Sequence, residues 1–281
     1  MKKWITSLLA IVCAMSNSIQ AIASDIEEKQ ETKIVLLSDI EWEPLNPARG
    51  DSSPKAGTLW GNRAGAEATG FLAKFVDGFS SPPHIHNVTY RAVVISGEIH
   101  NDDPNAEKMW MSRGSFWTQP KGEAHITAAR GEENIALVEI DEGPYLVQHT
   151  HDAFDSGERA VNIDASNIVW VTPPGLNPSK TGPKVAYLWG ILEAGLDNGT
   201  FIKLPAGFVG YIHSTGSIFR VVTIEGQPVY LEDEEIKLAP GSYFSSSGDS
   251  MHSIRSGPDQ DSIFYVRTNG PYRIIPASSQ E

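Results

Sequence analysis

Short apolar stretches alternate along the chain with turn-forming residues, and this pattern predicts strands. Four of these stretches, at residues 90–95, 135–140, 219–224 and 262–267, are rich in β-branched and aromatic side chains. Gly, Pro, Asn and Asp separate them, as they separate the strands of β proteins. No long segment shows the 3.6-residue hydrophobic period of an amphipathic helix. We therefore expect an all-β fold.

The sequence contains an internal repeat, in which Leu59, Trp60 and Gly61 recur as Leu188, Trp189 and Gly190. Other pairs are offset by 129 residues (Gly70 and Gly199, Gly78 and Gly207, His84 and His213, Gly97 and Gly226) or by 127 (Gly114 and Gly241, His125 and His252, Tyr145 and Tyr272). Such regular recurrence indicates two copies of one domain. We expect two tandem β-barrels or double-sheet jelly rolls, at residues 34–150 and 151–281.

Composition and charge limit the classes of binding partner that we expect. The chain has 25 Gly and 18 Pro among 281 residues, which favours a turn-rich β protein. Its formal net charge is −13, and no basic patch stands out. We therefore expect a small-molecule ligand and neither nucleic acid nor a membrane surface as a partner.

The N-terminus has the pattern of a secretory signal peptide. Lys2 and Lys3 precede an apolar stretch, and Ala21 and Ala23 form a small-x-small cleavage site. We expect residues 1–23 to be removed, residues 24–33 to form a flexible lead-in, and the mature protein to be periplasmic or secreted. The single cysteine, Cys13, would be removed with the signal peptide, which leaves no thiol for a disulfide.

Three histidines in the first copy have the spacing of a metal site. His84 and His86 are two residues apart, so on a strand both imidazoles point to the same face. A turn at residues 120–122 precedes His125, which we expect to approach from a neighbouring strand. Three neutral imidazoles suit one divalent metal ion, with Fe, Zn, Ni, Cu and Mn as the alternatives. Three protein ligands leave coordination positions open, as catalytic sites do.

The motifs that contain these histidines resemble a known family. The patterns Gly78-x5-His84-x-His86-x3-Tyr90-x6-Gly97 and Gly114-x5-Pro120-x-Gly122-x2-His125 resemble the paired signature motifs of the cupin superfamily. The duplication resembles a bicupin, and the whole pattern resembles a family of exported bicupins of unknown function. The resemblance implies small β-barrels with a metal on His84, His86 and His125. Tyr90 stands where cupins usually have a glutamate ligand, so the carboxylate is missing.

The second copy has lost part of the motif. Thr215 replaces the second histidine and Phe219 replaces Tyr90, which leaves His213 and His252. Two histidines without a carboxylate make a weak site, so we expect this barrel to be structural. Whether it binds any ligand stays open.

Several other residues are weighed as site candidates. Tyr90 could be a catalytic or metal-ligating phenol, but its counterpart Phe219 favours a packing role. Trp117 and Gln119 are candidate substrate-pocket residues from their motif positions. His100 is expected at the barrel rim or on the surface. His149 and His151 are expected in a solvated loop.

The site chemistry predicts a metal-dependent enzyme. Without a carboxylate ligand the metal keeps its full charge and should favour an anionic chelating ligand. The three-histidine set resembles cupins that cleave diketones or oxygenate thiols with Fe(II), so the leading hypothesis is a dioxygenase. The alternatives are a non-catalytic, metal-dependent binding or sensor protein, and a purely structural pair of barrels. Trp110, expected to point outward, suggests a homodimer.

Overall fold

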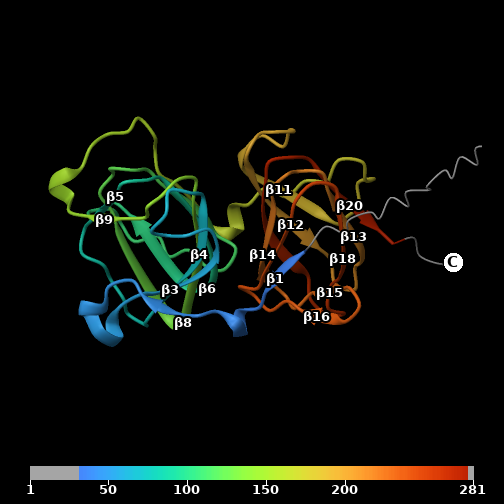
Figure 1. The fold of residues 1–281 in the computed structure, drawn as a ribbon, viewed down its shortest axis with the longest axis horizontal. Helices are drawn as coiled ribbons and strands as arrows, with labels where there is room; N and C mark the ends of the chain where they lie inside the picture. Colours follow the sequence, from blue (N-terminus) through green and yellow to red (C-terminus); the bar gives the residue numbers. More distant parts are fainter. Residues whose placement is uncertain (1–31, 278–281) are drawn as a thin grey trace, which may run out of the picture.

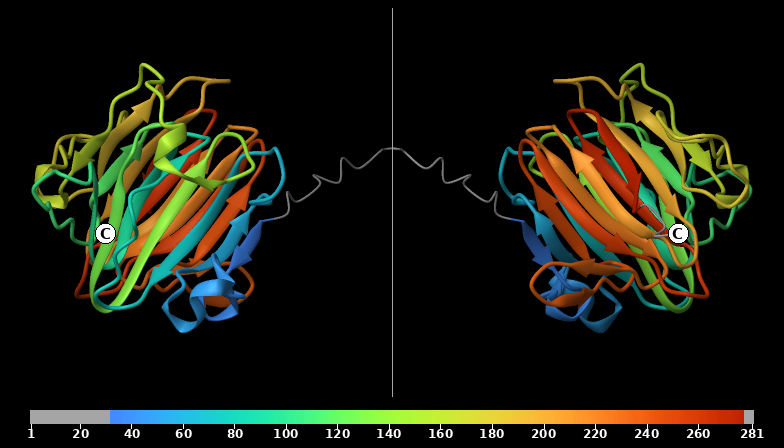
Figure 2. Two further views of the ribbon diagram at one scale, coloured as in Figure 1. Left: turned by 90° about the vertical axis from the view of Figure 1, so that its left-hand side faces the viewer. Right: turned by 90° about the vertical axis from the view of Figure 1, so that its right-hand side faces the viewer.

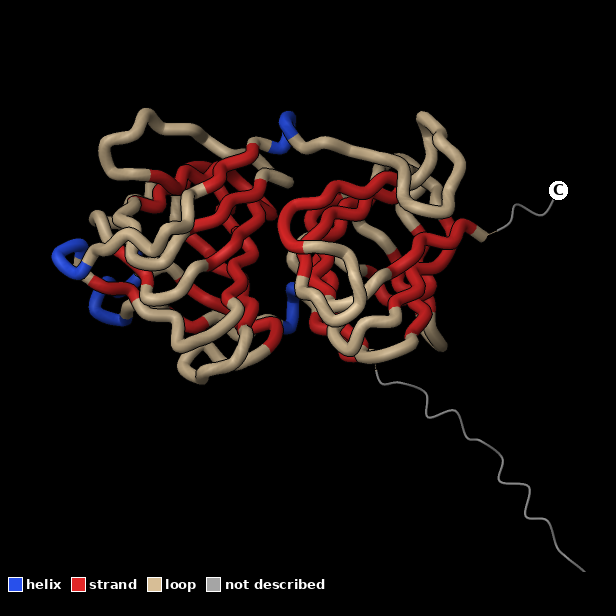
Figure 3. The backbone as a smooth tube through the Cα atoms, turned by 90° about the horizontal axis from the view of Figure 1, so that it is seen from above, coloured by secondary structure: helices blue, strands red, loops and turns tan. Residues whose placement is uncertain are grey.

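The computed structural model describes residues 32–277, and these residues form an all-β structure in two halves (Figure 1). Helices in this range are short 3-10 turns that connect strands (Figure 3). They are η1 (Leu37–Asp39), η2 (Pro47–Ser52), η3 (Thr150–Asp152) and η4 (Ala165–Asn167). The all-β class expected from the hydrophobic pattern is confirmed. Within residues 32–277, no helix has the length and apolar character that crossing a membrane requires.

Strands β1 to β9 lie in the part of the described chain that ends at Gln148. They are β1 (Lys33–Val35), β2 (Glu43–Pro44), β3 (Lys55–Trp60), β4 (Thr69–Phe75), β5 (Ile85–His86), β6 (Tyr90–Asp102), β7 (Phe116–Gln119), β8 (Ile126–Ile140) and β9 (Val147–Gln148). The strands that follow are β10 (Val161–Ile163), β11 (Lys184–Gly190), β12 (Asn198–Leu204), β13 (Val209–Ser214), β14 (Phe219–Glu225), β15 (Val229–Leu231), β16 (Glu235–Lys237), β17 (Tyr243–Ser246), β18 (Ser250–Arg255), β19 (Ser262–Thr268) and β20 (Tyr272–Pro276).

Each half is built from packed antiparallel sheets that do not close into barrels. The main sheet of the N-terminal half has the order β10-β7-β6-β8-β4-β3-β2, and β5 pairs with β9. The C-terminal half has a six-stranded sheet, β1-β17-β14-β19-β12-β11, and a five-stranded sheet, β16-β15-β18-β13-β20. The seven-stranded sheet of the N-terminal half and the six-stranded sheet of the C-terminal half, called the two large sheets below, lie one behind the other along the long axis of the molecule (Figures 1 and 2).

The two halves exchange their first strands. Strand β1 pairs with β17, with Val35 opposite Tyr243, and β10 pairs with β7, with Ile163 opposite Phe116. The repeat makes β1 equivalent to β10, and β17 equivalent to β7, so the exchange is reciprocal. The domain boundary expected between residues 150 and 151 stays a prediction. Each exchanged strand lies on one side of this boundary in the sequence and pairs with a strand on the other side.

Apolar side chains fill the space between the two large sheets. Val93 on β6 and Leu137 on β8 pack in one cluster with Phe201 on β12 and Tyr265 on β19. Trp60 also lies in this cluster, and a Cβ on Gly70 would come within 2.1 Å of its indole ring. Gly70 is therefore needed for the close approach of the ring to the strand.

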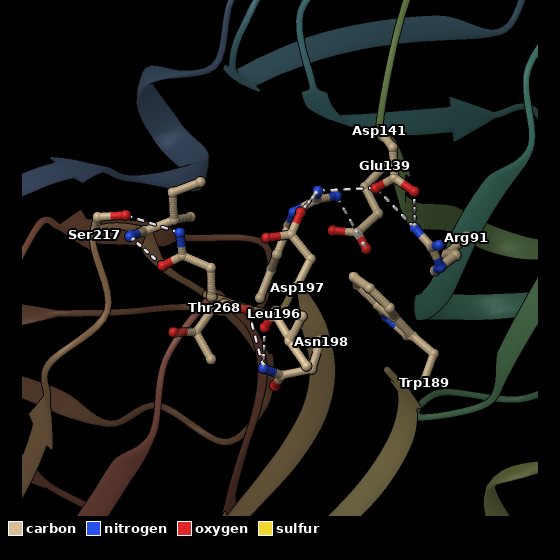
Figure 4. A network of polar contacts seen from close by, with 12 residues as sticks. Arg91, Glu139, Asp141, Trp189, Leu196, Asp197, Asn198, Ser217 and Thr268 are labelled. Atoms are coloured by element: carbon tan, nitrogen blue, oxygen red, sulfur yellow. Dashed lines mark hydrogen bonds and ion pairs between the residues drawn. The ribbon is translucent and has the colours of Figure 1, made fainter. Parts of the chain in front are cut away.

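A buried polar network also joins the halves (Figure 4). Arg267 on β19, with 2% of its side chain exposed, lies between Asp141 at 2.8 Å and Asp197 at 2.9 Å. The Tyr265 hydroxyl donates to Oε1 of Glu139 at 2.6 Å, and Arg267 Nη1 lies 3.7 Å from the same oxygen. Burial alone would lower the pKa of the Arg267 guanidinium, but the surrounding carboxylates outweigh it and raise that pKa. The guanidinium is therefore a permanent buried cation.

Two cation–π contacts repeat across the interface. The Arg91 guanidinium lies 3.7 Å from the ring centroid of Trp189, and the Arg220 guanidinium lies 5.2 Å from that of Trp60. The repeat relates Arg91 to Arg220 and Trp60 to Trp189. Each half therefore stacks an arginine on the tryptophan of the other, as the identical subunits of a two-fold dimer would.

Trp110 is less exposed than the sequence suggests. It is half-buried beneath the Arg130 guanidinium, which lies 4.3 Å from the centroid of the indole. Met111, on the opposite face, is fully buried as expected. A homodimer through Trp110 stays a prediction.

Removing the buried arginine tests the network. We expect Arg267→Ala to lower the free energy of unfolding by about 3–5 kcal/mol, because it leaves buried Glu139 without its cation. Urea unfolding followed by circular dichroism measures the change. The matched control is Arg255→Ala, which removes an exposed ion pair with Glu235 and should have little effect. Equal losses in the two variants would contradict the assignment.

Candidate metal centre

Strand pairing brings the three predicted histidines together. His84 and His125 exchange backbone hydrogen bonds of 3.0 Å in both directions, so their side chains leave neighbouring strands at the same level. His86 lies two residues further on, in β5. The nitrogen atoms that the three rings can offer to a metal all lie within 4.8 Å of one another. This cluster can bind a metal ion.

Backbone carbonyls fix the tautomer of all three imidazoles. A carbonyl oxygen only accepts hydrogen bonds, so each Nδ1 must carry its proton and each Nε2 keeps a lone pair for a metal. The three bonds run from His84 to Pro82 at 3.0 Å, from His86 to Leu146 at 2.8 Å and from His125 to Glu123 at 3.2 Å. Fixing Nδ1 in this way also orients each ring before any metal arrives.

The electrostatics of the cluster favour neutral rings. Burial, together with the charge of His84, lowers the pKa of His125 to about 3. The pKa of His84 is also lowered by burial, and that of His86 lies well below its usual range for the same reason. Nε2 of His125 is buried without a hydrogen-bond partner. A buried nitrogen with an unused lone pair fits a metal ligand, and so does a set of imidazoles that stays neutral.

Two of the three histidines lie in the wall of a cavity of about 470 Å³. His84 and His86 line it together with aromatic side chains from β4 and the segments around it, including Phe71, Phe75 and Phe79. The size is in the range of small-molecule sites. A metal held by the cluster would therefore face a space that can hold a ligand.

The candidate residues Tyr90, Trp117 and Gln119 all lie beside the cluster. Tyr90 and Trp117 line the cavity. The Tyr90 hydroxyl donates to Oδ1 of Asn101 at 2.8 Å, so it is directed into a buried network, as a packing role would require. Burial raises the pKa of Tyr90 to about 12. A neutral phenol engaged in this way fits a supporting residue better than a metal ligand.

Gln119 contacts the histidine cluster indirectly, through the Glu123 carbonyl. It is not among the described residues that line the cavity. Its Oε1 accepts from Asn101 at 2.9 Å, and its Nε2 donates to the Glu123 carbonyl at 3.2 Å. The same carbonyl accepts from His125 Nδ1. Gln119 therefore helps to position the carbonyl that orients His125.

Sequence reasoning missed Tyr145. Its hydroxyl lies 3.2 Å from His86 Nε2, and its ring stacks on that imidazole at 4.5 Å. A difference between the two copies of the repeat could have indicated this contact. The counterpart Tyr272 donates to or accepts from Thr200 at 2.6 Å, but the first copy has Phe71 where Thr200 stands. Because Phe71 has no side-chain oxygen to pair with, the Tyr145 hydroxyl contacts His86 instead.

The histidines of the second half are engaged in hydrogen bonds. His252 contacts the Tyr230 hydroxyl at 2.8 Å through Nδ1 and the Ser246 hydroxyl at 2.9 Å through Nε2. His213 Nε2 lies 2.6 Å from Asp249. Both ring nitrogens of His252 are thus occupied, as are those of His86, whereas Nε2 of His125, which is the counterpart of His252 in the repeat, has no partner. This difference supports a structural second half.

Two further histidine expectations have different outcomes. His100 was expected at the rim, which is wrong: it is 1% exposed, because β6 continues past Gly97 and carries it into the interior. Its Nδ1 lies 3.3 Å from the Met109 carbonyl. His149 and His151 lie at an exposed turn, as expected, and do not belong to the cluster.

The buried imidazoles make a pH prediction. A histidine in the unfolded chain titrates near 6.5, whereas His125 in the folded, metal-free chain titrates near 3. Between these values the unfolded state binds more protons, so stability falls as the pH falls from about 6.5 towards 3. We expect His125 alone to lower the free energy of unfolding by about 2–3 kcal/mol between pH 7 and 4.5. Urea unfolding of metal-free protein measures it. An unchanged pH slope in His125→Gln would contradict the assignment.

Solved structures with a similar fold include enzymes and other proteins. A candidate dioxygenase from Nostoc punctiforme is 14% identical with a TM-score of 0.63, over 86% of this chain and 83% of that one. The salicylate 1,2-dioxygenase of Pseudoaminobacter salicylatoxidans, in a variant bound to gentisate, is 14% identical with a TM-score of 0.55, over 88% and 86%. Vicilin from Corylus avellana is 10% identical with a TM-score of 0.55, over 86% and 87%.

At these identities the likeness shows the fold alone, which is the cupin-type arrangement of two double-sheet halves. No curated protein matches the sequence. The family model described as "Domain of unknown function (DUF4437)" matches residues 33–275, which is most of the chain. The protein therefore belongs to this family.

Proposed function

We propose that the protein is a metal-dependent dioxygenase that acts on a small anionic chelating substrate. The observation that supports this most is the histidine cluster: three buried, neutral imidazoles have their Nδ1 atoms bonded to carbonyls, and two of them, His84 and His86, line a ligand-sized cavity. No carboxylate of the described residues belongs to the cluster. A divalent ion held by His84, His86 and His125 would therefore keep its charge and attract an anion.

The residues around the cluster have separable roles in this proposal. When bound, the metal would supply Lewis-acid or redox chemistry at its open coordination positions. His84, His86 and His125 would hold it through the ring nitrogens that the carbonyls leave unprotonated. Burial raises the pKa of the Tyr145 phenol well above its usual range, and this keeps a proton donor beside His86. The aromatic walls exclude water from the ligand.

A non-catalytic binding or sensor protein is the second candidate. It would use the same cluster to hold the anion without converting it. The observation that favours it is that, within residues 32–277, no carboxylate and no histidine with a free Nδ1 lines the cavity to act as a general base. Measurements of turnover and of binding on the same samples separate the two candidates.

We also propose that the chain is exported. The support is the arrangement of Lys2, Lys3 and Ala21-Ile22-Ala23, residues that lie outside the described range of 32–277.

Metal stoichiometry tests the location of the site. We expect one divalent ion per chain, bound in the first half. His86→Ala should reduce the metal content to near zero, because two imidazoles lose a bond and the chelate constraint. His252→Ala should leave it at one, because His252 is engaged by Tyr230 and Ser246. Elemental analysis by plasma mass spectrometry decides it. Two ions per chain, or loss of metal only in His252→Ala, would show that the wrong half was assigned.

Oxygen uptake tests the reaction. Iron(II)-loaded protein is mixed with β-diketones, thiol carboxylates and hydroxybenzoates, and oxygen consumption is compared with substrate loss by mass spectrometry. We expect equimolar consumption with at least one of these classes, none with His86→Ala, and unchanged rates with His252→Ala. Binding without oxygen uptake would favour the sensor candidate, and uptake that persists in His86→Ala would exclude the cluster as the reaction site.

A further inference from the structure

Among the described residues that line the cavity beside the histidines, Arg49 has the only charged side chain. No described aspartate, glutamate or lysine lines this cavity. Arg49 lies in η2, the exposed turn between β2 and β3, and its guanidinium lies 5.2 Å from the ring centroid of Phe79. The cavity therefore combines apolar aromatic walls with one cation.

The charge of Arg49 is not neutralised by the protein. Among the described residues, no carboxylate lies within ion-pair distance of its guanidinium, whereas Arg63, Arg91 and Arg267 all pair with acids. This is notable in a chain whose net charge is −13. The turn itself is held without the Arg49 side chain, because Asn46 Oδ1 accepts from the Ala48 amide and the Asn46 carbonyl accepts from the Arg49 amide. The guanidinium is thus available to a ligand.

Two positions beside the cavity have larger side chains in the second half. The strand register places Ala73, which lines the cavity, opposite Ala136, and the equivalent pair is Ile202 opposite Phe264. Both larger side chains are fully buried in the core of the second half. At these two positions the first half therefore leaves space that large side chains occupy in the second half. Folding alone does not require this, since the second half packs without it.

We propose that this cavity binds an amphiphilic carboxylate, with a flat apolar body against the aromatic walls and its carboxylate at Arg49. The inference rests on the proposed function in placing the ligand beside the metal, and it adds the class of ligand and the residue that selects it. A single guanidinium suits a singly charged, planar carboxylate, which it can bind with two parallel hydrogen bonds. The volume of about 470 Å³ suits a molecule with a ring or a short branched chain.

Without the metal, a second negative charge would be unfavourable in this cavity. A phosphate dianion or a dicarboxylate would leave one charge against Phe71, Phe75 or Phe79, where burial of an unpaired charge is costly. Neutral apolar ligands would fit the walls but leave Arg49 without a partner. Arg49 is therefore a specificity residue, and the metal is not needed for this part of the recognition.

The experiment compares 2-naphthoate with its neutral isostere 2-naphthamide. Binding of each is measured by fluorescence titration of the full chain, as purified and after metal removal with a chelator. In the metal-free chain Arg49 is the only cation among the described residues of the cavity wall. We expect wild type to bind the naphthoate about five- to ten-fold more tightly than the amide. Arg49→Gln should abolish this preference and leave the affinity for the amide unchanged.

Two controls separate recognition from general effects. Arg159→Gln makes the same change of charge at an exposed arginine outside this cavity, and it should keep the preference. Ala73→Ile, which copies Ile202, should weaken binding of both probes by reducing the cavity. Unchanged melting temperatures show that each variant folds.

The proposal is overturned if metal-free wild type shows no preference, or if Arg49→Gln keeps it. Neither result depends on oxygen or on metal content, so a failure here is distinct from a failure of the proposed reaction. Conversely, a preference that disappears in Arg49→Gln supports the assignment even if oxygen uptake is never observed.

Discussion

Both faces of the main sheet of the N-terminal half are buried, and the site depends on which face each side chain occupies. Along β6, Tyr90 points to the cavity side, whereas Arg91 and Val93 point to the other half of the molecule. On β8, Ala136 points to the cavity side and Leu137 points to the other half. A shift of one residue in the pairing would reverse every assignment. The interface between the halves therefore fixes the register, and the register fixes the shape of the cavity.

The duplication explains why one half can specialise. The reciprocal exchange of β1 and β10 and the paired arginine–tryptophan stacks make the interface nearly symmetric. The central ion pair is where this symmetry breaks. Glu139 and Arg267 occupy equivalent register positions, opposite Gly70 and Gly199, yet they have opposite charges. Two identical residues there would repel or remain unpaired, so the divergence of the copies has produced a contact that a dimer of identical chains could not form.

The sequence alone was sufficient for the fold class, the repeat and the three histidines that the structure brings together. Each of these depends on local periodicity or on spacing within a strand. Tyr145, Arg49 and His100 could not be placed in the same way. Tyr145 approaches His86 only because β9 pairs with β5, and Arg49 lies at the cavity because of where η2 packs. His100 was misplaced because β6 extends beyond Gly97, a length that a glycine in the sequence did not suggest. Export concerns residues outside the described range.

The contrast between His125 and His252 shows how little separates a candidate metal site from a packed core. Both histidines are buried at the same position of the repeat, and burial lowers the pKa of both. In the second half Ser246 occupies Nε2, the nitrogen that a metal would need. In the first half Gln119 stands at that position, but its amide is engaged by Asn101 and the Glu123 carbonyl. Nε2 of His125 is consequently left without a partner. The buried network around Asn101 therefore keeps this nitrogen available, and a metal ion is the partner that would satisfy it.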